Sequence, residues 1–380
     1  MVDDLRYDGP WMANAPNMQA LITKGHTFEN SYCTWSVCGP SRTSILTGMR
    51  PMTIGFTANH GLELHGKWSL DSYPSLPQTF SADGRYTASV GKVNHNQYAW
   101  GEFDYDARPV TSPYCWNSDV LWCEYSWWKP YQNDAAVADA AIEVLDKVDS
   151  NGAAFLMMVG FHKPHVPWPI LPEDWDANAH VFEGVSADMR VHPRYARVPD
   201  NNGLPGLGGI GRVPGSSKWW RLWGRRLMDY NDAGPPWSLR SDYKTMILRR
   251  AYASSITRTD AEVGRVLAAA AKRDWYADNT VVVFMADHGF ALGESGKTGK
   301  HDLLDVQMRV PLSIVLPPHV AGAIHHASRT PRRFVSLLDV YPTLARLANI
   351  TADRVPRQVR AAQRSAHDVA TDGRAPCLFV

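Results

Sequence analysis

The chain has 380 residues, of which 44% are hydrophobic and 20% are charged, and its formal net charge is +1. This composition is typical of a folded globular protein. The near-zero net charge excludes a bulk electrostatic attraction to nucleic acid or to an anionic membrane, so we expect neither as a partner. No apolar run approaches the roughly 20 residues that span a bilayer, and the first ten residues contain no basic-then-apolar export signal.

Three apolar runs predict buried strands, and three periodic segments predict helices. In chain order, we expect a helix from Asp134, as its cap, to about Val148; a strand over 154–160; a helix over about 244–272; strands over 280–286 and 312–316; and a helix over 335–348. Alternating strands and helices favour an α/β domain in which helices cover a central sheet.

Two segments lack this periodicity. Residues 197–241 are rich in Gly, Pro and Trp and are predicted to form a long insertion loop. The loop contains a G-x-G-x-x-G pattern at Gly206, Gly208 and Gly211, but no strand precedes it, so we reject a dinucleotide site. Residues 351–380 are polar and rich in arginine, which predicts a poorly packed tail.

The five cysteines are odd in number and show no metal-like pairing. Cys115 and Cys123 are close enough in sequence to form a disulfide, and two free thiols are an equal alternative. The cysteines therefore do not decide whether the chain folds in an oxidising or a reducing compartment.

The run Cys-Gly-Pro-Ser-Arg begins at Cys38 and is the segment on which the functional prediction depends. Pro40 suits the first turn of a helix over 41–47, which Gly48 can end. A side chain at a helix N-terminus faces free N–H groups and the positive end of the helix dipole, and Arg42 adds a charged fork for an anion. A thiolate phosphatase loop is excluded, because it needs its arginine six positions after the cysteine, where a serine stands.

This run, with Leu46-Thr47-Gly48 behind it, resembles the signature of the type I sulfatases, the formylglycine-dependent members of the alkaline-phosphatase-like superfamily. In that family a formylglycine-generating enzyme oxidises the cysteine after translation. The resemblance therefore implies that Cys38 is the precursor of a catalytic nucleophile and that the modifying enzyme is a partner of this chain.

Other segments resemble family motifs in the expected order: the paired acids near the N-terminus, G-K-x-x-H from position 91, H-K-P-H from 162, and D-H-G-F-A-L-G-E from 287. The resemblance implies a calcium site built from Asp3, Asp4, Cys38, Asp287 and His288. It implies a catalytic set of Cys38, Arg42, Lys92, His95, His165 and Lys300. Zinc is rejected for His162 and His165, because no cysteine or third histidine stands at finger spacing.

The resemblance covers residues 1–350 and implies one catalytic domain with a three-layer α/β/α sandwich and a mostly parallel sheet. The residues of the last two motifs are most similar to the corresponding motifs of the iduronate-2-sulfatase-like enzymes. Three departures matter. Only Met1 and Val2 precede Asp3, so we expect an empty central strand position; most of the family's C-terminal subdomain is expected to be missing; and Ser295 stands where the family often has histidine.

By resemblance, the expected reaction is hydrolysis of a sulfate ester of a sugar or related alcohol, such as a glycosaminoglycan. His165 and Lys300 would protonate the leaving alcohol, and His95 would act on the second hydroxyl of the hydrated aldehyde. A phosphodiesterase or phosphonate hydrolase and a non-catalytic relative remain alternatives. The Trp- and Arg-rich run 218–226 suits either a sulfated polysaccharide or packing on the domain. The resemblance to this family suggests a secretory, lysosomal or periplasmic location.

Overall fold

The computed structural model describes residues 1–59, 74–95, 103–107, 122–124, 133–166, 168–182, 242–294, 297–323, 334–351, 354–356, 359 and 377–379. Several predictions lie outside these residues: the insertion loop 197–241 with its glycine pattern and its Trp- and Arg-rich run, the pairing of Cys115 with Cys123, and Ser295.

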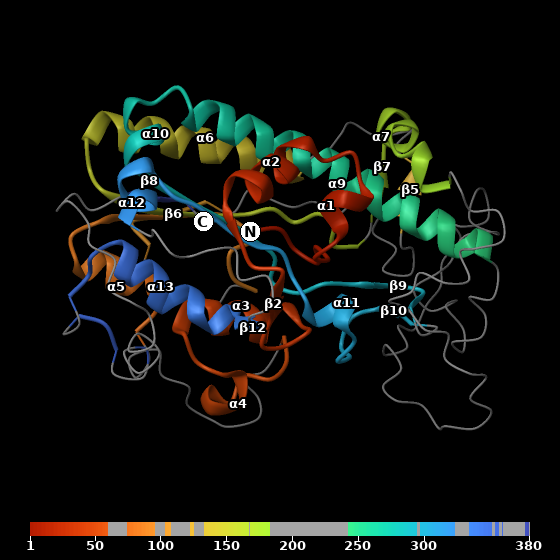
Figure 1. Cartoon of the computed structure of the whole chain (residues 1–380), viewed down its shortest axis with the longest axis horizontal. Coiled ribbons are helices and arrows are strands. Elements are labelled where there is room, and N and C mark those ends of the chain that lie inside the picture. Colours follow the sequence, from red (N-terminus) through yellow and green to blue (C-terminus); the bar gives the residue numbers. More distant parts are fainter. Residues whose placement is uncertain are drawn as a thin grey trace.

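A seven-stranded sheet runs through the middle of the molecule (Figure 1). Its order is β1 (His26–Thr27), β11 (Leu312–Val315), β8 (Thr280–Met285), β13 (Cys377–Phe379), β6 (Phe155–Gly160), β3 (Tyr86–Gly91) and β4 (Tyr105–Ala107). The five strands from β8 to β4 are parallel, and β11 and β1 are antiparallel to their neighbours. β6 and β8 are buried along their whole length, as continuous apolar strands between two helical layers must be.

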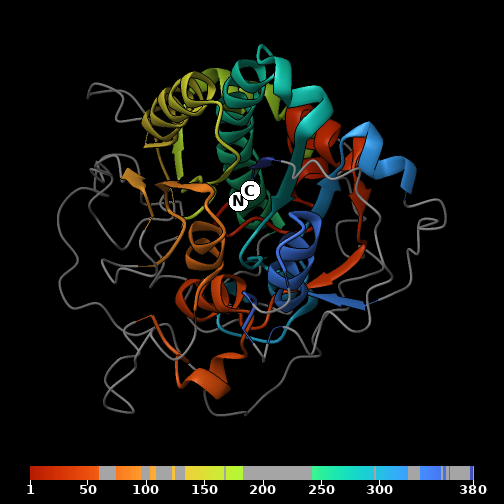
Figure 2. The ribbon, with the colours of Figure 1, turned by 90° about the vertical axis from the view of Figure 1, so that its left-hand side faces the viewer.

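Helices cover both faces of the sheet, which confirms the expected three-layer α/β/α sandwich (Figures 1 and 2). One face carries α2 (Pro16–Lys24), α6 (Asn133–Asn151) and α9 (Asp242–Ala270), and the other carries α3 (Cys38–Thr47), α5 (Leu76–Ala82) and α13 (Val340–Leu347). α6 buries one apolar stripe that includes Val137, Ala141 and Val144. No helix among the described residues is long and apolar enough to cross a membrane.

Shorter elements complete the described fold. The paired short strands are β9 (Ala291–Leu292) with β10 (Thr298–Gly299), β2 (Asn30–Tyr32) with β12 (Phe334–Ser336), and β5 (Trp122–Glu124) with β7 (Trp168–Ile170). The short helices are α1 (Gly9–Met12), α4 (Pro51–Ile54), α7 (Pro172–Ala177), η3 (Ala179–Phe182), α10 (Asp274–Asn279), α11 (Asp305–Met308), α12 (Pro318–Ala323) and η6 (Leu337–Asp339).

The predicted strands over 154–160, 280–286 and 312–316 are confirmed as β6, β8 and β11. Two helix predictions need correction. The segment 335–348 is not one helix, because it begins as β12 and turns through η6 into α13. The helix expected over 41–47 begins three residues earlier, at Cys38, because Val37 is the last residue with extended backbone angles.

The expectation of an empty central strand position is wrong. β13 lies between β6 and β8 and pairs in parallel with both. It is formed by three residues of the segment predicted to be a poorly packed tail.

Candidate active site

The motif residues converge where parallel strands end. The loops after β3, β6 and β8 leave from the same edge of the sheet, and Val2 joins them through parallel bridges to Phe161 and Ala286. Ligands bind beyond the carboxyl ends of strands in sheets of this kind. This edge brings together Asp3, Asp4, Lys92, His95, His162, His165, Asp287 and His288.

β3 and β6 end level with each other, with Gly91 opposite Gly160. A Cβ atom at Gly160 would lie 1.9 Å from the carbonyl oxygen of Lys92. Glycine is therefore required at position 160 for the backbone of Lys92 to turn into the site.

Cys38 is the first residue of α3, and all ten residues of this helix are buried. Its Sγ atom lies 3.0 Å from Nζ of Lys300, 3.2 Å from Nε2 of His288 and 3.8 Å from Nζ of Lys92. Burial and the carboxylate of Asp3 raise the pKa of the thiol, but these three cationic groups outweigh them, so the pKa lies below its ordinary value.

Asp3 and Asp4 are fully buried, but their environments differ. Asp3 accepts a hydrogen bond of 3.0 Å from Nη2 of Arg42 and forms an ion pair with Lys92. Burial raises its pKa, yet the two cations outweigh burial and hold the pKa well below the ordinary value. Asp4 forms an ion pair with Nζ of Lys300 at 2.8 Å, but burial outweighs the attraction of nearby cations and raises its pKa to about 7.

The segment after β8 adds another acid and an imidazole. Asp287 accepts from Nε of Arg42 at 2.8 Å and from the backbone N–H of Asp4 at 3.1 Å. Nε2 of His288 lies 3.4 Å from Oδ1 of Asp4. Burial lowers the pKa of His288, but Asp287 and Cys38 outweigh it and raise the pKa to about 9.

These residues suit a bound cation. Ligand atoms of Asp3, Asp4, Cys38 and His288 all lie within 4.8 Å of one another. Among the described residues, Oδ2 of Asp4 is buried without a hydrogen-bond partner. A buried, unpartnered carboxylate oxygen is costly, and a hard cation such as Ca²⁺ would satisfy it. Asp287 borders this group, with Oδ2 at 3.6 Å from Nε2 of His288.

A second group with metal-ligand geometry consists of Asp3, His162 and His165. The carboxylate of Asp3 already pairs with Arg42 and Lys92, so we assign no ion there.

Two further histidines are neutral in this environment. Burial, followed by Lys300, lowers the pKa of His165 well below its ordinary value, and its Nδ1 lies 2.6 Å from the carbonyl oxygen of Val166. Its Nε2 is the ring nitrogen left for chemistry. Burial and Lys92 lower the pKa of His95 to about 3, and its buried Nδ1 has no hydrogen-bond partner among the described residues.

The sequence did not reveal the role of Asp134. Its carboxylate accepts the backbone N–H groups of His162 at 2.7 Å and Lys163 at 3.1 Å, and the hydroxyl of Thr259 at 3.0 Å. α6 begins at Asn133, before Asp134, so the predicted cap role is wrong. Asp134 instead fixes the loop that carries His165.

Tyr252 of α9 was also missed. Asp4 has a φ of 60°, a left-handed conformation that is unfavourable for a residue other than glycine. The hydroxyl of Tyr252 donates to the carbonyl oxygen of Asp4 at 2.7 Å and accepts from the N–H of Arg6 at 2.9 Å. These bonds hold the strained turn, and no local sequence pattern predicts a contact over this separation.

Comparisons with known proteins agree with this geometry. Residues 1–350 match the sulfatase family. The chain is 28% identical to mouse iduronate 2-sulfatase over 402 residues, which cover 92% of this chain and 68% of that protein. The phosphonate monoester hydrolase of Agrobacterium radiobacter has a similar fold, with a TM-score of 0.65, 19% identity, and coverage of 90% of this chain and 72% of that one.

A protein solved in complex with its substrate D-glucosamine-2-N,6-O-disulfate has a TM-score of 0.64 and 21% identity, and the match covers all of this chain and 80% of that one. The family match spans most of the sequence, and the fold and the converging motifs agree with it. The chain therefore belongs to the sulfatase family of the alkaline-phosphatase superfamily.

Proposed function

We propose that this sulfatase hydrolyses a sulfate ester with a formylglycine made from Cys38, beside a Ca²⁺ ion held by Asp3, Asp4, Asp287 and His288. The observation that carries this proposal is the convergence of Cys38 with two acids and an imidazole within 4.8 Å, at the N-terminus of a buried helix. An unmodified structural cysteine would not need three cationic groups around its sulfur.

In the modified residue, the oxygen atoms of the hydrated formylglycine would lie where Sγ of Cys38 lies in this structure. Formylglycine would supply two geminal hydroxyls, one as nucleophile and one for the later release of sulfate. Calcium would supply Lewis-acid polarisation of the sulfate oxygens.

The cationic side chains stabilise the sulfate group during its transfer. The ammonium groups of Lys92 and Lys300 lie 3.8 Å and 3.0 Å from the sulfur of Cys38, so both charges are close to any anion bound there. Arg42 is held between Asp3 and Asp287 and orients both acids. Preorganised charges of this kind act most strongly in a buried site, where water cannot screen them.

The leaving alcohol needs a proton. Lys300 has a pKa well above its ordinary value, because Asp4 and Cys38 outweigh its burial, so it is protonated. His165 is neutral without substrate, and a bound sulfate monoester raises its pKa by adding a negative charge. We assign the proton transfer to His165, assisted by Lys300. His95 is neutral and accepts the proton of the remaining hydroxyl.

We place the substrate among sulfated sugars. The names of iduronate 2-sulfatase and of the protein solved with glucosamine disulfate both refer to sugars. Each of these two matches extends over most of this chain. The reaction consumes one water and gives an alcohol, sulfate and a proton.

Mass spectrometry tests the modification. After expression with a formylglycine-generating enzyme, trypsin releases residues 25–42, which contain Cys33 and Cys38. We expect fragment ions with an aldehyde at position 38 and an alkylatable thiol at the buried control, Cys33. An intact thiol at position 38 under these conditions contradicts the enzymatic proposal and favours a non-catalytic relative.

Substrate turnover tests the reaction. We expect the modified protein to hydrolyse an aryl sulfate faster than an aryl phosphate diester, and we expect Cys38→Ala to reduce both rates to background. Cys33→Ala, which leaves the site unchanged, is the matched control. Preference for the phosphate diester would assign the chain to the phosphodiesterase or phosphonate hydrolase alternative.

A further inference from the structure

Cys38 gives the site a sulfur donor beside an imidazole and a carboxylate. Its Sγ atom lies 3.2 Å from Nε2 of His288 and 4.0 Å from Oδ1 of Asp4, and that Nε2 lies 3.4 Å from the same oxygen. Tetrahedral bonds from one Zn²⁺ ion hold sulfur, nitrogen and oxygen ligands about 3.4–3.6 Å apart. The three donor atoms therefore form a triangle close in size to one face of a tetrahedral zinc site.

The imidazole of His288 is oriented as a metal ligand. Its Nδ1 lies 2.9 Å from the carbonyl oxygen of Gly289, which can only accept, so Nδ1 carries a proton and donates the hydrogen bond. Metal-binding histidines usually donate their second ring N–H in this way. Nε2, on the side of Cys38, is then the nitrogen at which a metal ion replaces a proton.

Asp4 has a carboxylate oxygen left for a cation. The residue is fully buried, and its Oδ2 has no hydrogen-bond partner among the described residues. Its Oδ1 pairs with Nζ of Lys300 at 2.8 Å, and the same ammonium group lies 3.0 Å from Sγ of Cys38. Lys300 therefore holds two of the three donor groups in place and leaves one oxygen of this carboxylate to the ion.

The fourth ligand need not be a side chain. Asp3 also lies within this group of ligands, but its carboxylate is already held by Arg42 and Lys92. Zinc sites that keep an open position have three protein ligands and a water molecule in the fourth place. We therefore count Asp4, Cys38 and His288 as the protein ligands and leave the fourth place to water.

The charges around Cys38 favour a cation. Three carboxylates pair with three cationic side chains, Asp3 and Asp287 with Arg42, Asp3 with Lys92, and Asp4 with Lys300. With these charges in balance, a thiolate at position 38 gives the buried group a net negative charge. A divalent cation offsets that charge where water cannot.

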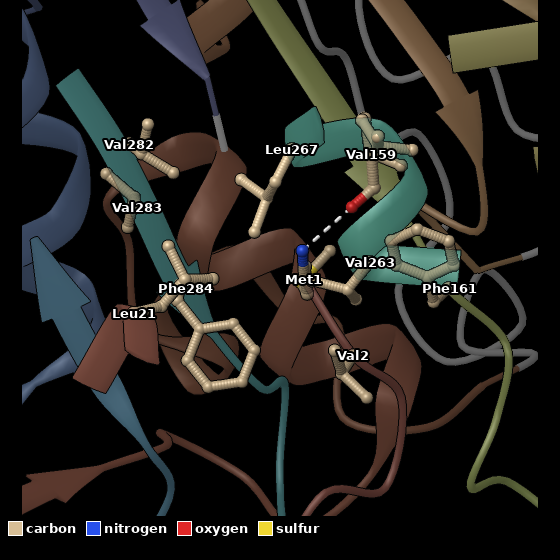
Figure 3. Close-up of a pocket in the computed structure, with 11 residues that line it drawn as sticks. Met1, Val2, Leu21, Val159, Phe161, Val263, Leu267, Val282, Val283 and Phe284 are labelled. Carbon is tan, nitrogen blue, oxygen red and sulfur yellow. Dashed lines mark hydrogen bonds between the residues drawn. The ribbon is translucent and has the colours of Figure 1, made fainter. Parts of the chain in front are cut away.

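An apolar cavity of about 30 Å³ between α9 and the sheet offers no alternative site (Figure 3). Its walls are aliphatic, aromatic and methionine side chains, among them Val159, Val263 and Phe284. It contains no thiolate, imidazole or carboxylate, which are the groups that bind zinc in proteins. The cavity therefore cannot hold the ion.

The donor types select the ion. Ca²⁺ takes about six to eight oxygen ligands, whereas thiolate and imidazole are ligands that Zn²⁺ prefers. We propose that the chain with an unmodified cysteine binds a thiophilic divalent ion, Zn²⁺, through Cys38, Asp4 and His288, and that formylglycine at position 38 changes the preference of the site from Zn²⁺ to Ca²⁺. The zinc site follows from the geometry above, and the change of preference rests on the proposed function. Formylglycine lacks the sulfur donor and its charge, and its hydrated form offers hydroxyl oxygens instead.

Cobalt spectroscopy tests the sulfur ligand. The chain is expressed without a formylglycine-generating enzyme, and alkylation after unfolding confirms the thiol at position 38. Co²⁺ then serves as a coloured probe of the zinc site. We expect one equivalent of Co²⁺ to give a thiolate-to-cobalt charge-transfer band, and one equivalent of Zn²⁺ to remove it. A spectrum without this band would overturn the zinc site.

Cys38→Ser exchanges only the sulfur for oxygen. Loss of a group that merely orients a ligand weakens metal binding about 10–100-fold, so loss of the ligand itself should weaken Zn²⁺ binding by about 100-fold or more in calorimetry. Cys33→Ser is the matched control, because Cys33 is also a buried free thiol but lies against Gln307 and Met308, and it should keep the affinity. Equal Zn²⁺ affinity in Cys38→Ser and the unaltered chain would overturn the proposal. If Cys38→Ser does not fold, Cys38→Ala takes its place.

Calorimetry with both ions tests the change of preference. We expect the unmodified chain to bind Zn²⁺ at least about 100-fold more tightly than Ca²⁺. The chain with an aldehyde at position 38 should bind Zn²⁺ as weakly as Cys38→Ser and Ca²⁺ more tightly than the unmodified chain. Equal Zn²⁺ affinities in the two forms would refute the change of preference. If no aldehyde forms, the proposed function and the change of preference both fail, whereas the cobalt spectrum and Cys38→Ser still decide the zinc site.

Discussion

At the scale of single residues, buried charges of opposite sign hold each other in place. Arg42, Lys92 and Lys300 each contact at least one buried carboxylate of the site. Removing one partner of a buried pair leaves an uncompensated charge that costs several kcal/mol. Substitutions in this group therefore change stability as well as chemistry, and useful tests must separate the two.

Replacing His165 should lower kcat most for substrates whose leaving group needs a proton. His165→Asn keeps a polar side chain but cannot transfer a proton, so we expect kcat to fall by about 10²–10⁴-fold on an alkyl or sugar sulfate. Nitrophenyl sulfate, whose leaving group needs no proton, should lose far less. Steady-state kinetics on both esters check this, and an equal loss on both would contradict the role of proton donor.

Asp134→Asn should loosen the loop that carries His165. Asparagine turns an N–H₂ group toward one of the two backbone N–H groups that the carboxylate accepts. Because small displacements of catalytic groups are costly, we expect a fall in kcat on the order of 100-fold. Asp139→Asn is the control, since Asp139 lies on the exposed face of the same helix, in a surface ion pair with Arg265.

The same variant should alter the pH dependence of stability. Burial raises the pKa of Asp134 to about 6, so the folded state holds this proton more tightly than the unfolded state. Between pH 4 and 6, wild type should lose stability relative to Asp134→Asn as pH rises, by on the order of 3 kcal/mol in total. Urea unfolding at several pH values measures this difference. A constant difference across that range would contradict it.

At the scale of elements, the level ends of β3 and β6 place Lys92 beside Cys38. Gly160→Ala would put a Cβ atom 1.9 Å from the carbonyl oxygen of Lys92, and no flexible side chain can move to relieve this contact. We expect lower activity and a lower Tm. Gly152→Ala is the control: its φ of 59° is unfavourable for alanine, but nothing lies within 4 Å, so its cost should be about 1–2 kcal/mol without loss of activity. Comparable activity losses in the two variants would argue against this contact.

The sequence predicted those elements whose own side chains are apolar. β6 and β8 were found because continuous buried strands are continuously hydrophobic. β3 was missed because Tyr86–Gly91 contains mainly small and hydroxyl side chains, although its interior is buried. β13 is also apolar, but it was missed because its three residues, inside a polar tail, are too few to show a period, and pairing with its two neighbours makes it a strand.

At the scale of the whole molecule, metal binding and stability should be linked. A ligand that binds only the folded state at about 100 times its Kd adds about 2.7 kcal/mol to stability. We expect added Ca²⁺ to raise Tm and a chelator to reverse it. Asp4→Asn should abolish the shift, whereas Asp302→Asn, which breaks the ion pair with Lys297 outside the site, should keep it. An unchanged Tm with Ca²⁺ would contradict a resident cation.

The meeting of several candidate site residues was predictable, because the motifs that contain Lys92, His165 and Asp287 follow the strands β3, β6 and β8. Resemblance supplied the residue types, and the structure brings Asp3, Asp4, Cys38 and His288 together. The supports of the site were not predictable. Asp134 and Tyr252 act on backbone groups far away in sequence, and such contacts leave no local pattern.

The complete burial of α3 constrains the timing of any enzyme that oxidises Cys38. Once the chain has folded, no residue of that helix is open to a second protein. The groups that enclose the sulfur, His288 and Lys300, are synthesised some 250 residues after it. During translation, the signature is therefore still an accessible peptide for an interval, and the proposed oxidation of Cys38 would have to take place before α3 is enclosed.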